Sequence, residues 1–439
     1  MVKLEILLAS LVLLCGQVVV WRRRDNILGY LQGGLFFASI LVPVLFTTII
    51  DNSDPLVVGL YAHILVVGAT GYLAGLLYGA LIGQRQRLPA VTFGRLLGER
   101  IPYAFTRRAR VIAFGALGAL GLSFVLLGYV PYLAADRVGA KYGIGIYRAG
   151  LERGALVFHL ALRMGSTILP VVLALWVRRR RGLDLLLAGA VCLGLLLTLS
   201  RGSALLGPLV FAIALMVSRN WRPWQVVAIV CAGFVSATLV NELIQVARPT
   251  TSASFSTRVA SSAPDLSDHL GFLNGFRVTG GEHVGLRPII AGMSLRKGQF
   301  NPSSYALRIR TGVVDSGEFA SGGLRLPAPL WGYASFGFLG AAVWSFISGA
   351  FVGWGSTVVR RLLTPVQGHP GQALNLILGW VFFQGTFAIL TDFYFPERVE
   401  IVSLAIAAAL CWAKTMRLPP EDDPAPVAAR VVAVGAGSG

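Results

Sequence analysis

The sequence predicts an all-α polytopic integral membrane protein with about 11 transmembrane helices and one large periplasmic loop. Two features of the composition lead to this fold class. Of the 439 residues, 55% are hydrophobic and only 13% are charged, whereas a soluble globular chain has about 45–50% apolar and about 25% charged residues. The mean hydropathy is +0.70. So few charged side chains cannot cover a water-soluble body, which excludes a large soluble enzyme.

Apolar segments of roughly 20 residues, the length that crosses a bilayer, follow one another along the chain. They lie near 4–21, 27–50, 56–83, 111–135, 155–177, 184–200, 203–218, 225–243, 328–355, 373–395 and 398–416. The expected division is a first membrane part at 1–243 with a basic outer loop at 136–153, a large periplasmic loop at 244–327, a second membrane part at 328–416, and a disordered cytoplasmic tail at 417–439.

Arginine-rich connections set the expected orientation, because short cytoplasmic connections carry an excess of Lys and Arg. All of the strong clusters fall on the cytoplasmic side if the chain starts outside and crosses about eleven times. These clusters are Arg22–Arg24, the seven arginines between Arg85 and Arg110, Arg178–Arg181, Arg219 with Arg222, and Arg360-Arg361.

The segment 182–218 lies between two of these clusters, so it must cross the membrane an even number of times. At 1.5 Å per residue its helix would be about 55 Å long, close to two passes of a hydrocarbon core of about 30 Å. A helical hairpin with its tip at Ser200-Arg201-Gly202 fits, whereas one long helix would bury Arg201 in hydrocarbon. Arg201 is therefore expected at the outer headgroup level, where it binds lipid phosphate or pyrophosphate, or snorkels towards the headgroups.

The outer loops break the charge rule. The large loop holds nine Lys and Arg residues against five acids, and the loop 136–153 is also basic. An anionic ligand would explain this excess, because the planar fork of Arg suits phosphate. The candidate ligands are Arg148, Arg277, Arg287, Arg296 and, within the span 155–177, Arg163. Solvated loop side chains, and a structural pairing of Arg163 with Asp392, are the alternatives.

A general base is sought among the outer acids and histidines, and the sequence does not choose one. The candidates in the large loop are Glu282, His283, Asp315 and Glu318. Asp268, His269, Asp392, Glu397 and Glu400 belong to the same pool. No Asp-x-Asp motif and no His/Cys cluster occurs, so no metal and no cofactor are expected. Without a soluble domain, nucleic acid is not expected as a partner.

Two short stretches stand out. They are Leu197-Thr-Leu-Ser-Arg-Gly-Ser-Ala-Leu-Leu-Gly207 and Leu326-Pro-Ala-Pro-Leu-Trp-Gly-Tyr-Ala-Ser-Phe-Gly-Phe-Leu-Gly340. The first resembles the Thr-x-Ser-Arg-Gly hairpin of the O-antigen polymerase and O-antigen ligase superfamily. The second resembles the re-entry of that superfamily into the membrane after its large periplasmic loop. The hydropathy pattern and the position of the large loop late in the sequence also resemble those of this superfamily over most of the chain.

The resemblance implies metal-independent, inverting glycosyl transfer at the periplasmic face of the bacterial inner membrane. A glycan on undecaprenyl diphosphate would move onto a hydroxyl of another lipid-linked glycan, so that the same lipid-linked glycan serves as donor and acceptor. The lipid bilayer and a chain-length regulator protein are the further partners considered. Arg201 matches the arginine of the family's hairpin and is expected to hold the donor diphosphate; the loop arginines match only in their basic character.

Three alternatives to a polymerase stay open. An O-antigen ligase would use the same donor and transfer to lipid A core, with His269 or His283 as its base. A flippase or other transporter is expected to show two related halves, which the sequence lacks. A polyprenyl-phosphate-sugar-dependent glycosyltransferase would use an acid in an early outer loop, such as Asp51 or Asp54.

Overall fold

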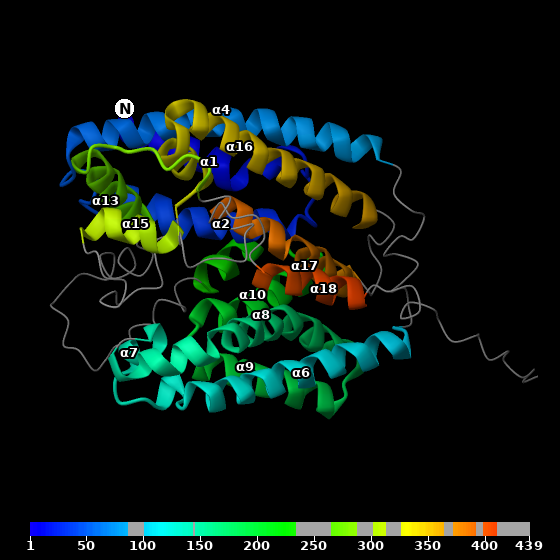
Figure 1. Ribbon diagram of the computed structural model, residues 1–439. Helices are drawn as coiled ribbons and strands as arrows, with labels where there is room; N and C mark the ends of the chain where they lie inside the picture. The colour runs from blue at the N-terminus through cyan, green and yellow to red at the C-terminus, as the bar shows by residue number, and fades with distance from the viewer. Residues whose placement is uncertain are drawn as a thin grey trace, which may run out of the picture.

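The computed structural model describes residues 1–86, 101–143, 145–233, 265–287, 302–312, 326–363, 372–391 and 398–410. Across these ranges the protein is helical and contains no strand (Figure 1). Six of the described helices are long and apolar enough to cross a membrane: Val2–Val19, Ile27–Phe46, Pro55–Arg85, Tyr103–Leu127, Gly139–Arg179 and Ala328–Leu363. Shorter apolar helices cover Gly182–Leu197, Gly202–Ser218, Pro223–Gly233 and Gln372–Val381. The all-α part of the prediction is confirmed for the described residues, and the six long apolar helices are compatible with a membrane protein; the count of about 11 transmembrane helices and the periplasmic loop stay predictions.

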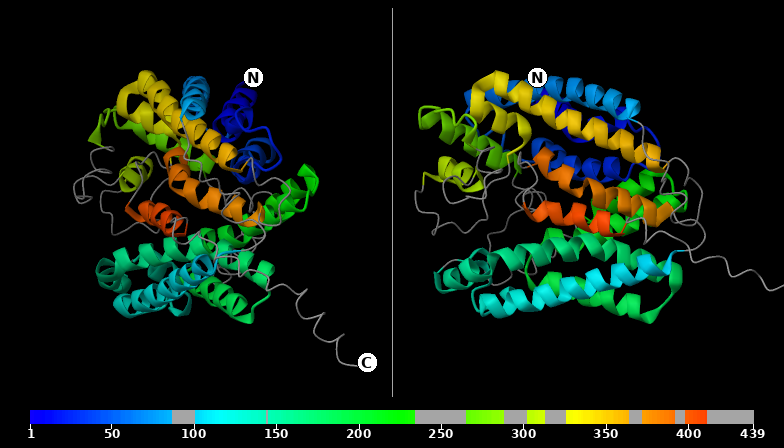
Figure 2. Two further views of the ribbon diagram at one scale, coloured as in Figure 1. Left: turned by 90° about the vertical axis from the view of Figure 1, so that its right-hand side faces the viewer. Right: turned by 45° about the vertical axis from the view of Figure 1, so that its right-hand side comes forward.

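The helices stack in three layers (Figures 1 and 2). The upper layer of Figure 1 contains α1 (Val2–Cys15), α4 (Pro55–Arg85) and α16 (Ala328–Leu363). The middle layer contains α2 (Ile27–Phe36), α10 (Arg201–Ser218), α17 (Gln372–Thr391) and α18 (Arg398–Leu410). The lower layer contains α6 (Tyr103–Leu127), α8 (Arg148–Arg179) and α9 (Gly182–Leu197). Two helices of the large loop, α13 (Asp265–Val278) and α15 (Pro302–Thr311), lie at one end of the upper layer.

Helices α4 and α16 run parallel in direct backbone contact. A Cβ at Gly75 would lie 1.9 Å from the carbonyl oxygen of Phe346, and one at Gly79 would lie 1.9 Å from that of Ala350. Small residues at every fourth position allow such close approach, which drives helix association in lipid through van der Waals contact. The same interface includes Gly68, Gly71 and Gly83 on α4 and Gly349 and Gly353 on α16. At Gly75 and Gly79 no larger residue fits without moving the backbone of α16.

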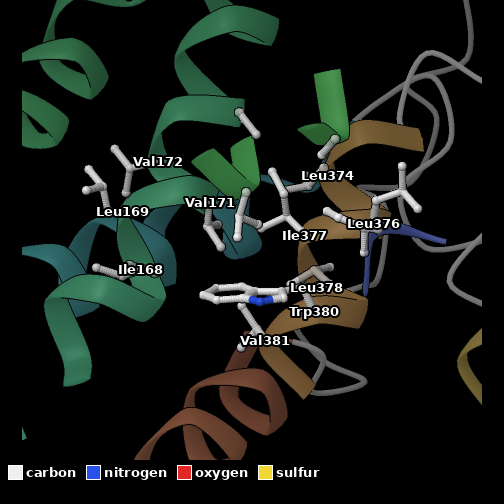
Figure 3. Close-up of a cluster of buried hydrophobic side chains, with 14 of the residues drawn as sticks. Ile168, Leu169, Val171, Val172, Leu374, Leu376, Ile377, Leu378, Trp380 and Val381 are labelled. Atoms are coloured by element: carbon white, nitrogen blue, oxygen red, sulfur yellow. The ribbon is translucent and has the colours of Figure 1, made fainter. Parts of the chain in front are cut away.

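Two buried apolar clusters hold the layers together. One joins α6, α8, α9, α10, α17 and α18, with Trp380 of α17 lying near Ile168 and Val171 of α8 (Figure 3). The other joins α4, the start of α16, and the loop helices α13 and α15 around the buried Trp331. The loop helices therefore contribute side chains to a core that they share with the upper layer.

One end of the bundle is rich in arginine; we call it the arginine end. It contains the C-terminal ends of α4, α8 and α16 and the N-terminal ends of α6 and α9. Nη1 of Arg361 lies 2.9 Å from the carbonyl oxygen of Gly83, and Nη1 of Arg179 donates to Oγ1 of Thr106 at 2.6 Å. We call the opposite end, with α13, α15 and residues 47–54, the α13 end. Arginines from distant clusters of the sequence thus meet at one end.

The predicted hairpin at 182–218 is confirmed. Helix α9 ends at Leu197 and α10 begins at Arg201. Leu199 takes a left-handed conformation with φ 59°, which turns the chain within three residues. The turn is held by Thr198, whose Oγ1 accepts a hydrogen bond from the amide of Ser200 at 3.2 Å.

The structure adds detail to two of the predicted segments. The span predicted near 27–50 appears as Ile27–Phe46 and contains a π-helical stretch, Phe37–Leu41, between α2 and α3 (Val42–Phe46). Pro43 explains the irregularity, because proline has no N–H to donate and its ring clashes with the carbonyl four residues earlier. The segment 136–153, predicted as a basic outer loop, contains the short helix α7 (Arg137–Tyr142) and the first turn of α8.

Candidate functional site

Helix α13 is fixed against the first turns of α4 by side chains from both. The buried Tyr61 hydroxyl lies 3.0 Å from Nδ1 of the buried His269. Arg277 Nη2 pairs with Oδ2 of Asp54 at 2.9 Å, while Oδ1 of Asp54 caps α4 by accepting from the amide of Leu56 at 2.9 Å. His269 and Arg277, both considered from the sequence as functional residues, therefore make structural contacts that dock the large loop.

Helix α15 is in turn held by α13. Arg310 pairs with Asp268, and a Cβ at Gly275 would lie 1.9 Å from the carbonyl oxygen of Ile309. The ion pair engages Asp268, which belonged to the pool of base candidates. The two loop helices form one platform on the end of the upper layer (Figure 1).

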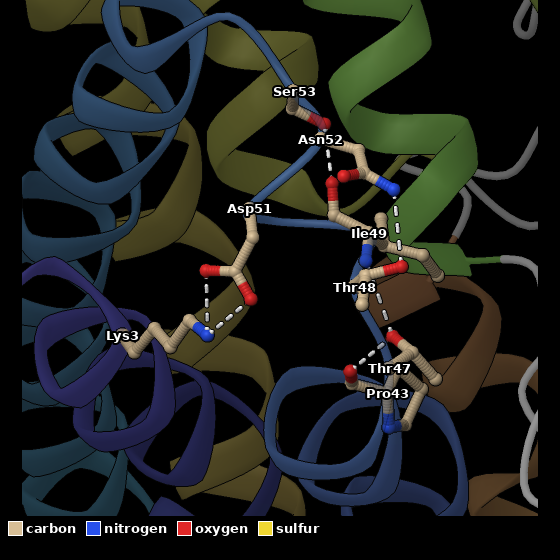
Figure 4. Close-up of polar contacts among 8 residues, drawn as sticks. All are labelled: Lys3, Pro43, Thr47, Thr48, Ile49, Asp51, Asn52 and Ser53. Atoms are coloured by element: carbon tan, nitrogen blue, oxygen red, sulfur yellow. Dashed lines mark hydrogen bonds and ion pairs between the residues drawn. The ribbon is translucent and has the colours of Figure 1, made fainter.

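The turn between α3 and α4 belongs to the same end and is braced by its own polar groups (Figure 4). Lys3 Nζ pairs with Asp51 at 2.8 Å, and the Ser53 hydroxyl donates to the carbonyl of Ile49 at 2.6 Å. Asp51 and Asp54 thus both have structural partners.

The re-entry stretch forms a sharp break in α16. Phe336 (φ −146°, ψ 26°) and Gly337 (φ 64°, ψ −151°) are not helical. Gly332 and Gly340 touch, because a Cβ at Gly332 would lie 2.2 Å from the carbonyl oxygen of Gly340. A continuous helix would hold residues eight apart about 12 Å from each other along its axis. The piece before the break therefore folds back against the piece after it.

The break releases main-chain carbonyls that a continuous helix would use internally. The carbonyl of Ala334 accepts from the amide of Val284 at 3.0 Å, and that of Ser335 accepts from the amide of Gly285 at 3.2 Å. His283 precedes these two residues, and its Nδ1 lies 3.4 Å from the Ala334 oxygen. The break thus holds the loop histidine in place through the backbone.

Aromatic rings surround His283. The ring centroids of His283 and Tyr333 are 6.2 Å apart at an interplanar angle of 83°, and those of His283 and Phe276 are 5.9 Å apart. Tyr333 also packs edge-to-face on Phe338 at 5.2 Å. Rings in this arrangement gain about 0.5–1.5 kcal/mol per pair beyond the area they bury. The imidazole is exposed on its remaining side.

Three charged side chains lie close to Tyr305 of α15. Burial raises the pKa of the Tyr305 hydroxyl, Glu282 raises it further, and Arg287 and Arg308 lower it. Glu282, Arg287 and Arg308 are all exposed. Two exposed guanidinium groups of the large loop therefore act electrostatically on the same hydroxyl.

The structure brings together only some of the residues selected from the sequence. Glu282, His283, Arg277 and Arg287 lie at the α13 end. Arg148, the first residue of α8, pairs with Glu152 in the next turn at 3.1 Å, and Arg163 lies about four turns into the same helix. Arg201 is the first residue of α10. Asp315, Glu318, Arg296, Asp392 and Glu397 fall outside the described residues.

Tyr305, Tyr333, Phe338 and Gly337 were not selected from the sequence. Three of them, Tyr333, Gly337 and Phe338, belong to the stretch 326–340 that resembles the superfamily's re-entry. The Phe-Gly pair inside an apolar run was the available signal, because glycine supplies the positive φ that a break needs.

Among the described residues, no three His, Cys, Asp or Glu side chains gather as a metal site would require. The chain was compared with protein-family models, with curated proteins and with solved structures. No family model, no curated protein and no solved structure matches it.

Proposed function

We propose that the protein polymerises undecaprenyl-diphosphate-linked oligosaccharide repeat units, as an O-antigen polymerase does, by inverting glycosyl transfer that needs no metal. The observation that carries this proposal is the contact between His283 and the break at Phe336-Gly337. It joins a base candidate of the large loop to the stretch that resembles the superfamily's re-entry. We place this site at the periplasmic face of the bacterial inner membrane.

The orientation follows from the charge rule. Arginines gather at the arginine end, and basic ends of membrane helices face the cytoplasm. The α13 end would then face the periplasm, where lipid-linked glycans are available. Arg201 begins α10 at the turn opposite the arginine clusters that flank 182–218, which suits a headgroup-level contact.

His283 would act as the general base. With Nδ1–H directed at the Ala334 carbonyl, Nε2 keeps its lone pair and accepts the proton of an acceptor hydroxyl. The hydroxyl oxygen then forms a bond to the anomeric carbon of the donor, while the bond from that carbon to the diphosphate oxygen breaks and its electron pair leaves with undecaprenyl diphosphate. The imidazolium later releases the proton to water. Attack opposite the leaving group inverts the anomeric centre.

The leaving diphosphate gains charge in the transition state, so nearby cations lower the barrier. Arg287 is the described arginine closest in sequence to His283 on the large loop, and it acts electrostatically on Tyr305 together with Arg308. Arg201 would hold the donor diphosphate, as the resemblance implies. The arginine side chains would then neutralise the charge on the leaving diphosphate, a role that a metal ion has in other enzymes.

A reconstituted assay tests the proposal. Purified protein receives one synthetic undecaprenyl-diphosphate-linked repeat unit without divalent metal, and the products are separated on a gel. A ladder of multiples supports polymerisation. Product that forms only after lipid A core is added would assign a ligase instead. If neither reaction gives a product, and the lipid-linked glycan moves across the membrane of reconstituted vesicles, the protein is a transporter.

His283→Ala should lower transfer by about 10²–10⁴-fold, the usual contribution of a general base. His63→Ala is the matched control, because His63 is an exposed histidine on α4 and should leave the ladder unchanged. Full activity of His283→Ala together with an inactive Glu282→Gln would move the base to the neighbouring carboxylate.

A further inference from the structure

We infer that the break in α16 forms a subsite for the acceptor sugar, with Gly337 as its floor and the rings of Tyr333 and Phe338 beside it. The inference rests on the proposed function and names its second substrate position. The ligand is a neutral pyranose ring that presents a hydroxyl to Nε2 of His283.

The side of Gly337 that a side chain would occupy faces His283. Apart from its chain neighbours and the adjoining backbone of its own helix, a Cβ added at Gly337 would contact only His283 among the described residues, with Nε2 at 3.8 Å and Cε1 at 3.9 Å, which are ordinary van der Waals distances. Its φ of 64° with ψ of −151° belongs to a region that side-chain-bearing residues avoid. The same glycine that makes the break therefore places no side chain against Nε2 of His283.

The rings beside Gly337 suit the apolar face of a sugar. Tyr333 and Phe338 pack edge-to-face at an interplanar angle of 69°, so a ring face is not covered by the pair itself. Phe338 is 45% exposed. The electron-rich face of an aromatic ring attracts groups of positive partial charge, such as the C–H groups of a pyranose.

Hydrogen-bonding groups accompany these rings. The His283 imidazole packs edge-to-face on the phenol ring of Tyr333, with ring centroids 6.2 Å apart. A polyprenyl chain offers no hydrogen bonds and would leave such groups unsatisfied at a cost. A pyranose offers both a C–H face and hydroxyls, so it fits the mixed lining better than lipid does.

The subsite is tested with a labelled acceptor that cannot donate. The repeat unit is attached to a short fluorescent alkyl chain without diphosphate, and its extension from the undecaprenyl-diphosphate donor is followed in wild-type protein and in Phe338→Ala. We expect the acceptor KM to rise about fivefold to tenfold with kcat little changed, because the contact binds ground state and transition state alike. The donor KM should stay at its wild-type value.

Phe351→Ala is the matched control, since Phe351 is a 38% exposed phenylalanine farther along α16. Tyr333→Leu should act like Phe338→Ala, and Tyr333→Phe should retain most acceptor binding. If Phe338→Ala and Phe351→Ala have the same acceptor KM, the rings are membrane-interface aromatics and the subsite is wrong.

Binding is measured apart from catalysis by saturation-transfer NMR of the same acceptor. Saturation that reaches the pyranose C–H protons in wild-type protein and is lost in Phe338→Leu supports the subsite even where no transfer occurs, in which case only the proposed function fails. Absence of saturation transfer in active wild-type protein overturns the subsite and leaves the proposed function standing.

Discussion

The arginines at the two ends of the molecule are held in different ways. At the arginine end, guanidinium groups donate to main-chain carbonyls of other helices, as Arg361 does to Gly83, or pair with a carboxylate that is fully buried, Asp184. At the α13 end, Arg277 and Arg310 pair with partly exposed carboxylates, while Arg287 and Arg308 are exposed near Tyr305. A surplus of arginine in a sequence thus divides into residues that join helices and residues open to a ligand.

Asp184→Asn should give the largest effect on stability. Asp184 accepts two bonds from Arg110, at 2.7 and 3.0 Å, and has no exposed surface. Removing the carboxylate leaves a poorly solvated guanidinium, which costs about 3–5 kcal/mol in such pairs. Thermal unfolding in detergent measures the loss. The double variant with Arg110→Gln should recover part of it; an unchanged melting temperature for Asp184→Asn would show that the arginine end is not held by this pair.

Arg287→Ala should lower activity strongly with little change in stability. Loss of one preorganised group that stabilises developing charge lowers kcat by about 10²–10³-fold. Turnover of the lipid-linked repeat unit measures this, beside the melting temperature. Arg137→Ala, an exposed arginine of α7, is the control. Equal turnover of the two variants would show that Arg287 is a solvated loop residue that does not take part in transfer.

Arg361→Ala should destabilise the α4–α16 pair to an intermediate extent. Its Nη1 also lies 3.2 Å from the carbonyl oxygen of Gln84 and 2.8 Å from that of Gln86, so it caps the C-terminal end of α4. Hydrogen bonds to a charged group contribute about 1.5–3 kcal/mol. Arg361→Lys should recover little, because lysine lacks the planar fork. A lysine variant as stable as wild type would show that the positive charge alone, without the planar guanidinium group, stabilises this contact.

Arg277→Ala should give the smallest effect. The ion pair with Asp54 joins side chains that are 46% and 35% exposed, and such pairs contribute about 0.2–1 kcal/mol. We expect a melting temperature close to wild type at low salt and no difference at high salt, where exposed charges are screened. If Arg277→Ala lowered the melting temperature as much as Asp184→Asn does, the arginines at the two ends would contribute equally to stability.

Much of the membrane part could be predicted from the sequence, because hydropathy and arginine spacing act locally. The hairpin between α9 and α10 follows from two features of the segment 182–218. The segment is too long for one crossing, and the arginine clusters at both of its ends require an even number of crossings. The irregularity at Phe37–Leu41 is harder to predict, since Pro43 sits inside an otherwise continuous apolar run.

The candidate site could be predicted only in part. His283 and Glu282 were selected because base chemistry is restricted to a few residue types. The position of His283 beside Gly337 depends on the contact between Gly332 and Gly340 and on backbone bonds between the large loop and α16, which no periodicity reveals. Arg277 was selected for its charge, and only the structure shows its partner Asp54.

The glycine contacts between α4 and α16 have a consequence for biosynthesis. Helix α4 ends at Arg85 and its partner ends at Leu363, so 278 residues are made between them (363 − 85). At about 5–20 residues per second this takes roughly 14–56 seconds. Throughout that time the glycine face of α4 must be covered by lipid or by the insertion machinery, and the upper layer closes only when the chain is nearly complete.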